Sequence, residues 1–260
     1  MKKITFLICT VIFMGMGLNL VYADSAQDIY KIKNRGVLVA GVKTDMEKFG
    51  YKDPKTDNID GFEIDIARAI AKKIFGDANK LELIPVTTQS REYLLYSGKL
   101  DIIAATFTIT TQREQFYNFS PPYYTDGLAL MVRKDSNIKS LKTLNGKSIG
   151  TVYGTTSRAV LREVAEQSSM KFKFFSFGAY SEIKSALASS AVDCFVADKS
   201  ILSQYIDDSM MILDDTLSAE NYGIASLKGD TQLGEVVNEV INELKSSGEL
   251  SKLAKKWNLE

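Results

Sequence analysis

The stretch D-I-I-A-A-T-F-T-I-T-T-Q-R-E-Q-F-Y-N-F-S-P-P-Y-Y, residues Asp101–Tyr124, is the most informative part of this chain. It opens with the apolar run Ile102–Ala105, which predicts a short buried strand. A threonine-rich turn follows, and Gln112-Arg113 falls near the start of an expected short helix. A guanidinium fork beside hydroxyls and free backbone N–H groups at a helix start can receive a carboxylate. Taken alone, the same residues also fit an ordinary strand, loop and helix with a surface arginine, so both interpretations stay open here.

Apolar strands alternate with amphipathic helical patterns on both sides of this stretch, which is typical of an α/β architecture. The pattern starts again after a polar connector at 133–137, which indicates two α/β units with extended segments between them. A long helix is expected after Asp230, and a last helix carries Leu250, Leu253 and Trp257. The predicted strands are 37–42, 81–86, 102–105, 128–132, 147–152, 172–177, 193–197 and 221–227, and the other predicted helices are 62–75, 91–97, 157–167 and 180–189.

Residues 1–23 have the features of a secretory signal peptide. Two lysines precede an apolar run at 4–20, and small residues end the segment at Ala23, where we expect cleavage. The run is at the short end for spanning a bilayer, and Cys9 lies in its middle rather than next to the cleavage site, as a lipid anchor would need. We therefore expect a secreted protein without a lipid anchor, located in the periplasm.

The composition and charge of this chain argue against several classes of function. Removing 23 residues that include two lysines and no acidic residue leaves 237 residues, with 30 basic and 32 acidic side chains. This balance argues against nucleic acid as a partner, because nucleic acid requires a concentrated basic field. The chain has no histidine, and Cys194 is the single cysteine after cleavage, which argues against His-based catalysis and a thiolate-rich metal cluster. We expect no cofactor and no metal.

Six separated motifs carry a resemblance to a known family. In this order they are similar to the extracytoplasmic solute-binding proteins for polar amino acids (solute-binding protein family 3), the capture subunits of ABC importers, and most similar to aspartate/glutamate-binding members. The motifs are R-G-V-L-V-A-G-V-K at 35–43, G-F-E-I-D-I-A-R-A-I-A at 61–71, the block at 101–113, F-S-P-P-Y-Y at 119–124, L-N-G-K-S-I-G-T-V-Y-G-T-T at 144–156 and V-D-C-F-V-A-D-K-S-I-L at 192–202.

The resemblance implies an α/β fold with two lobes, of the periplasmic binding protein type II. The ligand cleft would lie between the lobes, which two crossing segments would join near 128–132 and 221–226. Because the family inserts the second lobe into the first, the resemblance implies a first lobe at 24–130 plus 225–260. The second lobe would then be 131–224.

The resemblance also implies which residues bind the common part of an amino acid. Arg113 would grip the α-carboxylate, supported by Thr108 through its N–H or hydroxyl. Thr155-Thr156, after a strand of the second lobe, would complete this clamp, although as a local pattern the pair equally fits a helix cap. Asp198 would take the α-ammonium at the carboxyl end of a strand, and its own alternative is also a helix cap.

Three further residues align with the side-chain pocket of acidic amino acid binders: Lys43, Arg91 and Tyr180. Two cations beyond the α-carboxylate clamp imply a second anionic group, because a neutral amide would leave their charge uncompensated. Each of them alone also fits a solvated surface residue. Tyr153 and Phe49 would line the ligand stem. The complete set of expected ligand contacts is Lys43, Arg91, Thr106, Thr108, Arg113, Tyr153, Thr155, Thr156, Tyr180 and Asp198.

These expectations describe a monomeric binding protein and not an enzyme. It would capture L-aspartate or L-glutamate by hinge closure and deliver it to an ABC permease. A first alternative is glutamine, asparagine or cystine on the same scaffold. A second is a dehydratase-like enzyme, against which the lack of histidine counts. A sensor or adhesin role is a third alternative.

Overall fold

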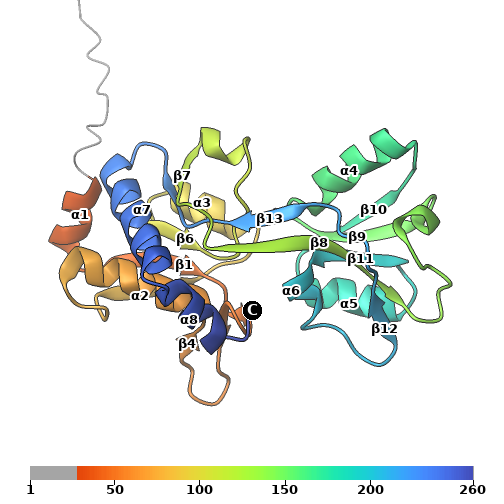
Figure 1. Cartoon of the computed structure of the whole chain (residues 1–260), viewed down its shortest axis with the longest axis horizontal. Helices are drawn as coiled ribbons and strands as arrows, with labels where there is room; N and C mark the ends of the chain where they lie inside the picture. The colour runs from red at the N-terminus through yellow and green to blue at the C-terminus, as the bar shows by residue number, and fades with distance from the viewer. Residues whose placement is uncertain (1–27, 260) are drawn as a thin grey trace, which may run out of the picture.

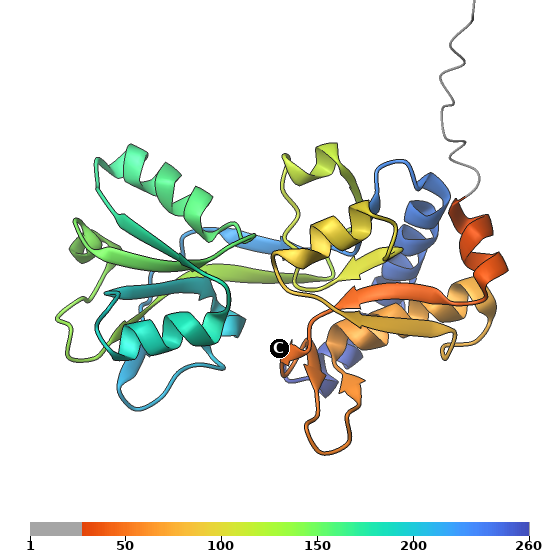
Figure 2. The same cartoon turned by 180° about the vertical axis from the view of Figure 1, so that it is seen from behind.

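The computed structural model describes residues 28–259, and the predicted signal peptide lies outside them. The described chain forms two lobes, each with its own β-sheet and flanking helices, joined by two extended segments that run side by side (Figures 1 and 2). In this part of the chain no helix is long and apolar enough to cross a membrane.

The first lobe is built on a five-stranded sheet in the order β5-β1-β6-β14-β7. Strand β1 pairs in parallel with β5 and β6, while β14 runs antiparallel to β6 and β7. All residues of β1 and β6 are buried, which explains why they are continuous apolar runs rather than alternating patterns. The strands are β1 (Leu38–Val42), β5 (Leu81–Pro85), β6 (Ile102–Ala104), β7 (Tyr117–Phe119) and β14 (Ala225–Leu227).

Helices cover this sheet, and a small three-stranded sheet extends from the lobe. The predicted helix at 62–75 has the predicted bounds, and its buried side chains include Phe62, Ile66 and Ile70. The helices are α1 (Asp28–Arg35), α2 (Phe62–Phe75), α3 (Ser90–Tyr96), the 3₁₀ turn η2 (Arg113–Gln115), α7 (Thr231–Ser246) and α8 (Glu249–Lys256). The small sheet contains β2 (Asp45–Met46), β3 (Gly50–Lys52) and β4 (Ile59–Asp60).

The second lobe has a sheet in the order β10-β9-β11-β8-β12, and β13 pairs with one end of β8. Strands β9, β10 and β11 are parallel, and β8 is antiparallel to β11. The strands are β8 (Tyr124–Arg133), β9 (Ser148–Val152), β10 (Lys173–Phe177), β11 (Cys194–Asp198), β12 (Met210–Ile212) and β13 (Ala219–Tyr222). The helices are α4 (Ser157–Ser168), α5 (Tyr180–Ala188), α6 (Lys199–Leu202) and the 3₁₀ turn η3 (Leu141–Leu144).

The crossings differ from the prediction. Residues 128–132 pair with β11 inside the second sheet, so the first crossing lies earlier, at 124–127, where β8 pairs with β13. The predicted strand at 221–227 is two strands, β13 at the crossing and β14 in the first sheet. An apolar run does not reveal which sheet it joins, and this caused the misplacement. We propose lobe boundaries within 124–127 and 219–222 instead of at 130/131 and 224/225.

Candidate functional site

Five predicted site residues follow the carboxyl ends of strands. Lys43 follows β1, Thr106 follows β6, Tyr153 follows β9, Asp198 ends β11, and Arg91 lies at the start of α3 after β5. Ligands of α/β sheets generally bind at this edge. The topology therefore places the predicted residues at facing edges of the two sheets.

Two arginines of the first lobe lie against one aromatic ring. The Cζ atoms of Arg91 and Arg113 are 4.4 Å and 4.2 Å from the centre of the Phe107 ring. Arg91 is 2% exposed, and the side chain of Arg113 is 12% exposed. Burial, followed by repulsion from Arg91, lowers the pKa of Arg113 to about 10. Arg113 has one long ion pair, 3.6 Å to Oε1 of Glu92, whereas Arg91 has none among the described residues, so an anion placed between the two guanidinium groups would still offset their repulsion.

Both arginines also reach the second lobe at one carbonyl oxygen. Nη2 of Arg91 and Nη2 of Arg113 donate to the oxygen of Gly154, over 3.1 Å and 3.0 Å. Nη1 of Arg113 donates to the carbonyl of Thr108, over 2.9 Å. The carbonyl of Thr108 thus positions Arg113 within the first lobe, and the expected contact of the Thr108 N–H or hydroxyl with a ligand carboxylate stays a prediction.

Arg91 is also bound within its own lobe. Its Nη1 donates to the carbonyls of Ala105 and Thr106, over 2.5 Å and 3.2 Å, and its buried Nε has no partner. Thr106 has a φ of 45°, in the left-handed region that non-glycine residues seldom adopt. Its N–H donates to the buried Glu63 carboxylate, over 2.6 Å. Glu63 therefore holds the backbone that receives Arg91.

Lys43 is buried, at 3% exposure, and is already paired. Its Nζ lies 2.9 Å from Oδ1 of Asp45, whose side chain is half exposed. Lys43 therefore lies at the carboxyl end of β1, and it already has a protein counter-charge. Because of this pair, Lys43 does not require an anionic ligand. Arg91 is the stronger reason to expect an anionic ligand.

Asp198 ends β11 at the edge of the second sheet. It is 8% exposed, and its carboxylate accepts a hydrogen bond from the hydroxyl of Tyr222. Burial raises the pKa of Asp198 to about 7, although the Tyr222 bond opposes the shift. Its side chain makes no cap bond to α6, whose Ser200 N–H instead donates to Asp126 over 3.1 Å. Asp198 thus occupies the N-cap position of α6, but the side chain that bonds the helix start is Asp126 of β8.

Further acidic groups lie beside Asp198 at the crossing. Asp126 and Glu220 are directly opposite each other on β8 and β13, and their charges contribute to the raised pKa of Asp198. Glu220 is 2% exposed and accepts hydrogen bonds from Thr156 and Ser218. The facing sheet edges thus present cations from the first lobe, and carboxylates from the crossing and the second lobe. A zwitterion would bind with its anionic end toward the first lobe.

The remaining predicted residues differ in their surroundings. Thr156 binds Glu220, whereas the hydroxyl of Thr155 donates to the carbonyl of Val152 over 2.8 Å within its own turn. Tyr180 is buried and packs against the rings of Phe195 and Tyr205.

The two aromatic residues expected beside the ligand stem lie in different surroundings. Tyr153 is 52% exposed, and Phe49 is fully buried in an aromatic cluster with Phe62, Tyr124 and Tyr222, so it is core. The residues that the sequence argument missed are Asp45, Glu63, Phe107, Asp126, Gly154, Glu220 and Tyr222. Glu63 and Asp65 are both acids in the first turn of α2, and no local pattern shows that Glu63 is the buried one.

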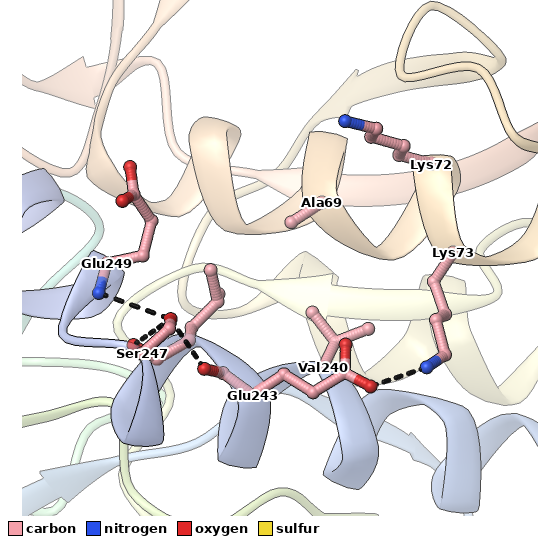
Figure 3. Close-up of a pocket in the computed structure, with 8 residues that line it drawn as sticks. Ala69, Lys72, Lys73, Val240, Glu243, Ser247 and Glu249 are labelled. Atoms are coloured by element: carbon pink, nitrogen blue, oxygen red, sulfur yellow. Dashed lines mark hydrogen bonds and ion pairs between the residues drawn. The ribbon is translucent and has the colours of Figure 1, made fainter.

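A hollow of about 600 Å³ lies elsewhere, between α2, α7 and the start of α8 on the first lobe. Figure 3 shows Lys73 reaching across it toward Glu243, with Nζ 2.6 Å from Oε1, while Lys72 points away. Lys73, Glu243 and Glu249 already have ion-pair partners, and the hollow is remote from the strand ends that hold the predicted residues. We assign no ligand to it. Among the described residues no group of three His, Cys, Asp or Glu side chains could hold a metal ion.

Comparison with known proteins identifies the family. Residues 38–260 match the bacterial extracellular solute-binding proteins, family 3. The chain belongs to this family. A family 3 solute-binding protein acts outside the cytoplasm, which agrees with the predicted location.

Several relatives of this family 3 protein carry a ligand in their names. This chain is 41% identical over 201 residues to the glutamine-binding protein of Geobacillus stearothermophilus, and the match covers 76% of this chain and 75% of that protein. It is 38% identical over 229 residues to the ABC transporter glutamine-binding protein GlnH of Bacillus subtilis (strain 168), covering 87% and 82%. The glutamate/aspartate import solute-binding protein of Escherichia coli (strain K12) is more distant, at 26% over 261 residues, covering 95% and 86%.

Solved structures confirm the predicted two-lobe α/β architecture. The P235GK mutant of the arginine-binding protein from T. maritima has a TM-score of 0.78 and 32% identity, covering 90% of this chain and all of that chain. The ancestral amino acid-binding protein AncCDT-1, a precursor of cyclohexadienyl dehydratase, has a TM-score of 0.76 and 32% identity, covering 88% and 98%. The two relatives named for glutamine are more similar to this chain than the one named for glutamate and aspartate.

Proposed function

We propose that this family 3 protein captures an acidic L-amino acid, aspartate or glutamate, by hinge closure and delivers it to an ABC permease as a monomer. The family, and relatives named for amino acids, support the general part of this proposal. The charges that line the cleft support the acidic ligand.

The α-carboxylate and α-ammonium groups of the ligand would be held between the lobes. Arg113 presents a planar fork of donors suited to the α-carboxylate, and Asp198 presents a buried carboxylate suited to the α-ammonium. One ligand that touches both would favour the closed arrangement by its contacts with each lobe.

The observation that supports a ligand with an acidic side chain is the burial of Arg91 without an ion pair among the described residues. This guanidinium is 2% exposed, its hydrogen-bond partners are carbonyl oxygens, and no described carboxylate forms an ion pair with it. Burial lowers the pKa of Arg91, and the acids that oppose this shift, Glu92 and Glu63, act without direct contact. A ligand carboxylate beside Arg91 would offset this desolvation, whereas an amide would not.

Glutamine is the second candidate. The Lys43–Asp45 pair neutralises one of the two cations assigned to the side chain, and the two more similar relatives are named for glutamine. Arginine fits poorly, because its side chain would bring a third guanidinium near Arg91 and Arg113.

Calorimetry on the chain without residues 1–23 tests the proposal. The panel is L-aspartate, L-glutamate, L-glutamine, L-asparagine, L-cystine and L-arginine. We expect aspartate or glutamate to bind with micromolar affinity or better, about −8 kcal/mol or lower. Glutamine binding tenfold tighter than both acids would contradict the acidic assignment. Incubation with prephenate, followed for product, addresses the dehydratase alternative.

Closure can be tested at Gly154. This residue has a φ of 77°, and a Cβ there would lie 2.2 Å from the carbonyl oxygen of Thr88 in the other lobe. Gly154→Ala should therefore hold the lobes apart and weaken every bound amino acid by about tenfold or more. Gly146→Ala is the matched control, because Gly146 has a φ of 78° and nothing near its added Cβ. It should lose a little stability and keep its affinity, and equal affinities for both variants would refute closure at this contact.

A further inference from the structure

The pair between Lys43 and Asp45 is a built feature of the first lobe. Gly50 packs so closely on the carbonyl of Lys43 that an added Cβ would lie 2.4 Å from that oxygen. Asp45 is paired with Tyr51 across the small sheet, and the N–H of Lys52 donates to the carbonyl of Thr44 over 3.0 Å. This hairpin turns the chain back directly after β1, and so brings Asp45 over the side chain of Lys43.

The two partners differ in their freedom. The side chain of Lys43 is 4% exposed, whereas that of Asp45 is 51% exposed. The ammonium is therefore fixed inside the protein, while the carboxylate reaches it from the rim. An exposed carboxylate can turn toward water at small cost, because surface ion pairs contribute little.

Asp45 also lies at the seam between the lobes. Two residues further on, the N–H of Glu47 donates to Oε1 of Gln204 in the second lobe, over 3.2 Å. The charge of Asp45 contributes to the raised pKa values of Tyr180 and Tyr205, after burial as the main cause. Asp45 therefore occupies the region where the side chain of a ligand would meet Lys43 and Tyr180.

We propose that Asp45 determines the preference between acidic and amide side chains, by competing with the ligand's carboxylate for Lys43. The proposal rests on the proposed function, in which the side chain of the ligand reaches Lys43. An ammonium has three donors, so it can hold both carboxylates or exchange one for the other. In both cases Asp45 weakens the binding of an acidic ligand. If Lys43 holds both carboxylates they repel each other, and if the ligand replaces Asp45 the internal ion pair is lost. A glutamine side chain meets no such repulsion.

The test is the ratio of the dissociation constants for glutamine and glutamate, measured by calorimetry. Asp45→Asn keeps the shape of the side chain and removes its charge. We expect the ratio to shift toward glutamate by about fivefold, the size of one modest charge interaction. Asp45→Glu keeps the charge and is the matched control, with a ratio close to that of the unmodified protein. Melting curves show whether each variant is folded.

A double-mutant cycle with Lys43→Gln identifies the route. In a protein that carries Lys43→Gln, adding Asp45→Asn should change the logarithm of this ratio by less than half as much as it does in the unmodified protein. An unchanged ratio in Asp45→Asn alone, in a protein that binds acidic amino acids, overturns this proposal and leaves the proposed function intact. An unmodified protein that prefers glutamine, yet shifts toward glutamate in Asp45→Asn, supports the role of Asp45 and refutes the acidic assignment. Binding of none of glutamine, glutamate and aspartate contradicts both.

Discussion

Replacing Arg113 by alanine is expected to weaken binding of every amino acid in the panel, by about 30-fold or more. The reason is that its guanidinium would meet the α-carboxylate, which all of these ligands share. Removing one partner of a desolvated charge pair costs on the order of 2–5 kcal/mol. The variant also loses the bonds to Thr108 and Gly154, so part of the effect would come from weaker contact between the lobes. Calorimetry with aspartate, glutamate and glutamine measures the loss.

A variant of Arg91 is the comparison for Arg113→Ala. Arg91→Gln removes the charge but keeps donors for the carbonyls of Ala105 and Thr106, which makes it a milder change than truncation. We expect it to weaken acidic ligands far more than glutamine, because the side-chain group alone depends on this charge. Equal losses for all ligands in both variants would show that the two roles are misassigned. A glutamate-selective loss in Arg113→Ala would show that they are exchanged.

Replacing Asp198 by asparagine is expected to weaken ligand binding by about a hundredfold or more. The ligand's α-ammonium would then be buried without its counter-charge, and leaving a charge unpaired in the interior costs several kcal/mol. Asparagine still accepts a hydrogen bond from Tyr222, and Asp126 still caps α6. The protein should therefore stay folded. A lower melting temperature with an unchanged dissociation constant would show that Asp198 has only a structural role.

The effect of pH separates the charge of Asp198 from its hydrogen bond. Burial raises its pKa from 3.8 to about 7, so the folded protein binds this proton more tightly than the unfolded chain does. The contribution of Asp198 to the free energy of unfolding should therefore fall as pH rises from about 4 to about 7. Asparagine does not titrate, so Asp198→Asn should gain stability relative to the unmodified protein over that range.

Glu63 provides the control for this comparison, because burial raises its pKa to about 7 as well and both proteins contain it. Its contribution should cancel in the difference between the two unfolding curves. Ligand affinity of the unmodified protein should rise toward pH 7, because the ammonium binds the ionised form of Asp198. An affinity difference between the two proteins that does not change with pH would contradict this role.

The sequence by itself determined the class of fold and most of its elements. Helix α2 was predicted with its observed bounds because its apolar residues repeat at helical spacing over four turns and Gly76 follows. Strands β1, β6, β9 and β11 were found within one or two residues, because buried parallel strands are short apolar runs between polar turns. Strands β2, β3, β4, β7 and β12 were missed, because two or three residues cannot show a period.

Only the tertiary structure decided the partners of the site residues. Lys43 and Asp45 are two positions apart in the sequence, yet their ion pair depends on a hairpin whose close packing at Gly50 no local pattern reveals. The side chain that bonds the start of α6 is Asp126, far away in the sequence, so the carboxylate of Asp198 is not used by its own helix. Residue types and strand ends are local properties, so a sequence can indicate which charges reach a cleft. Whether a buried charge is already compensated depends on distances between separate segments, and folding alone sets those distances.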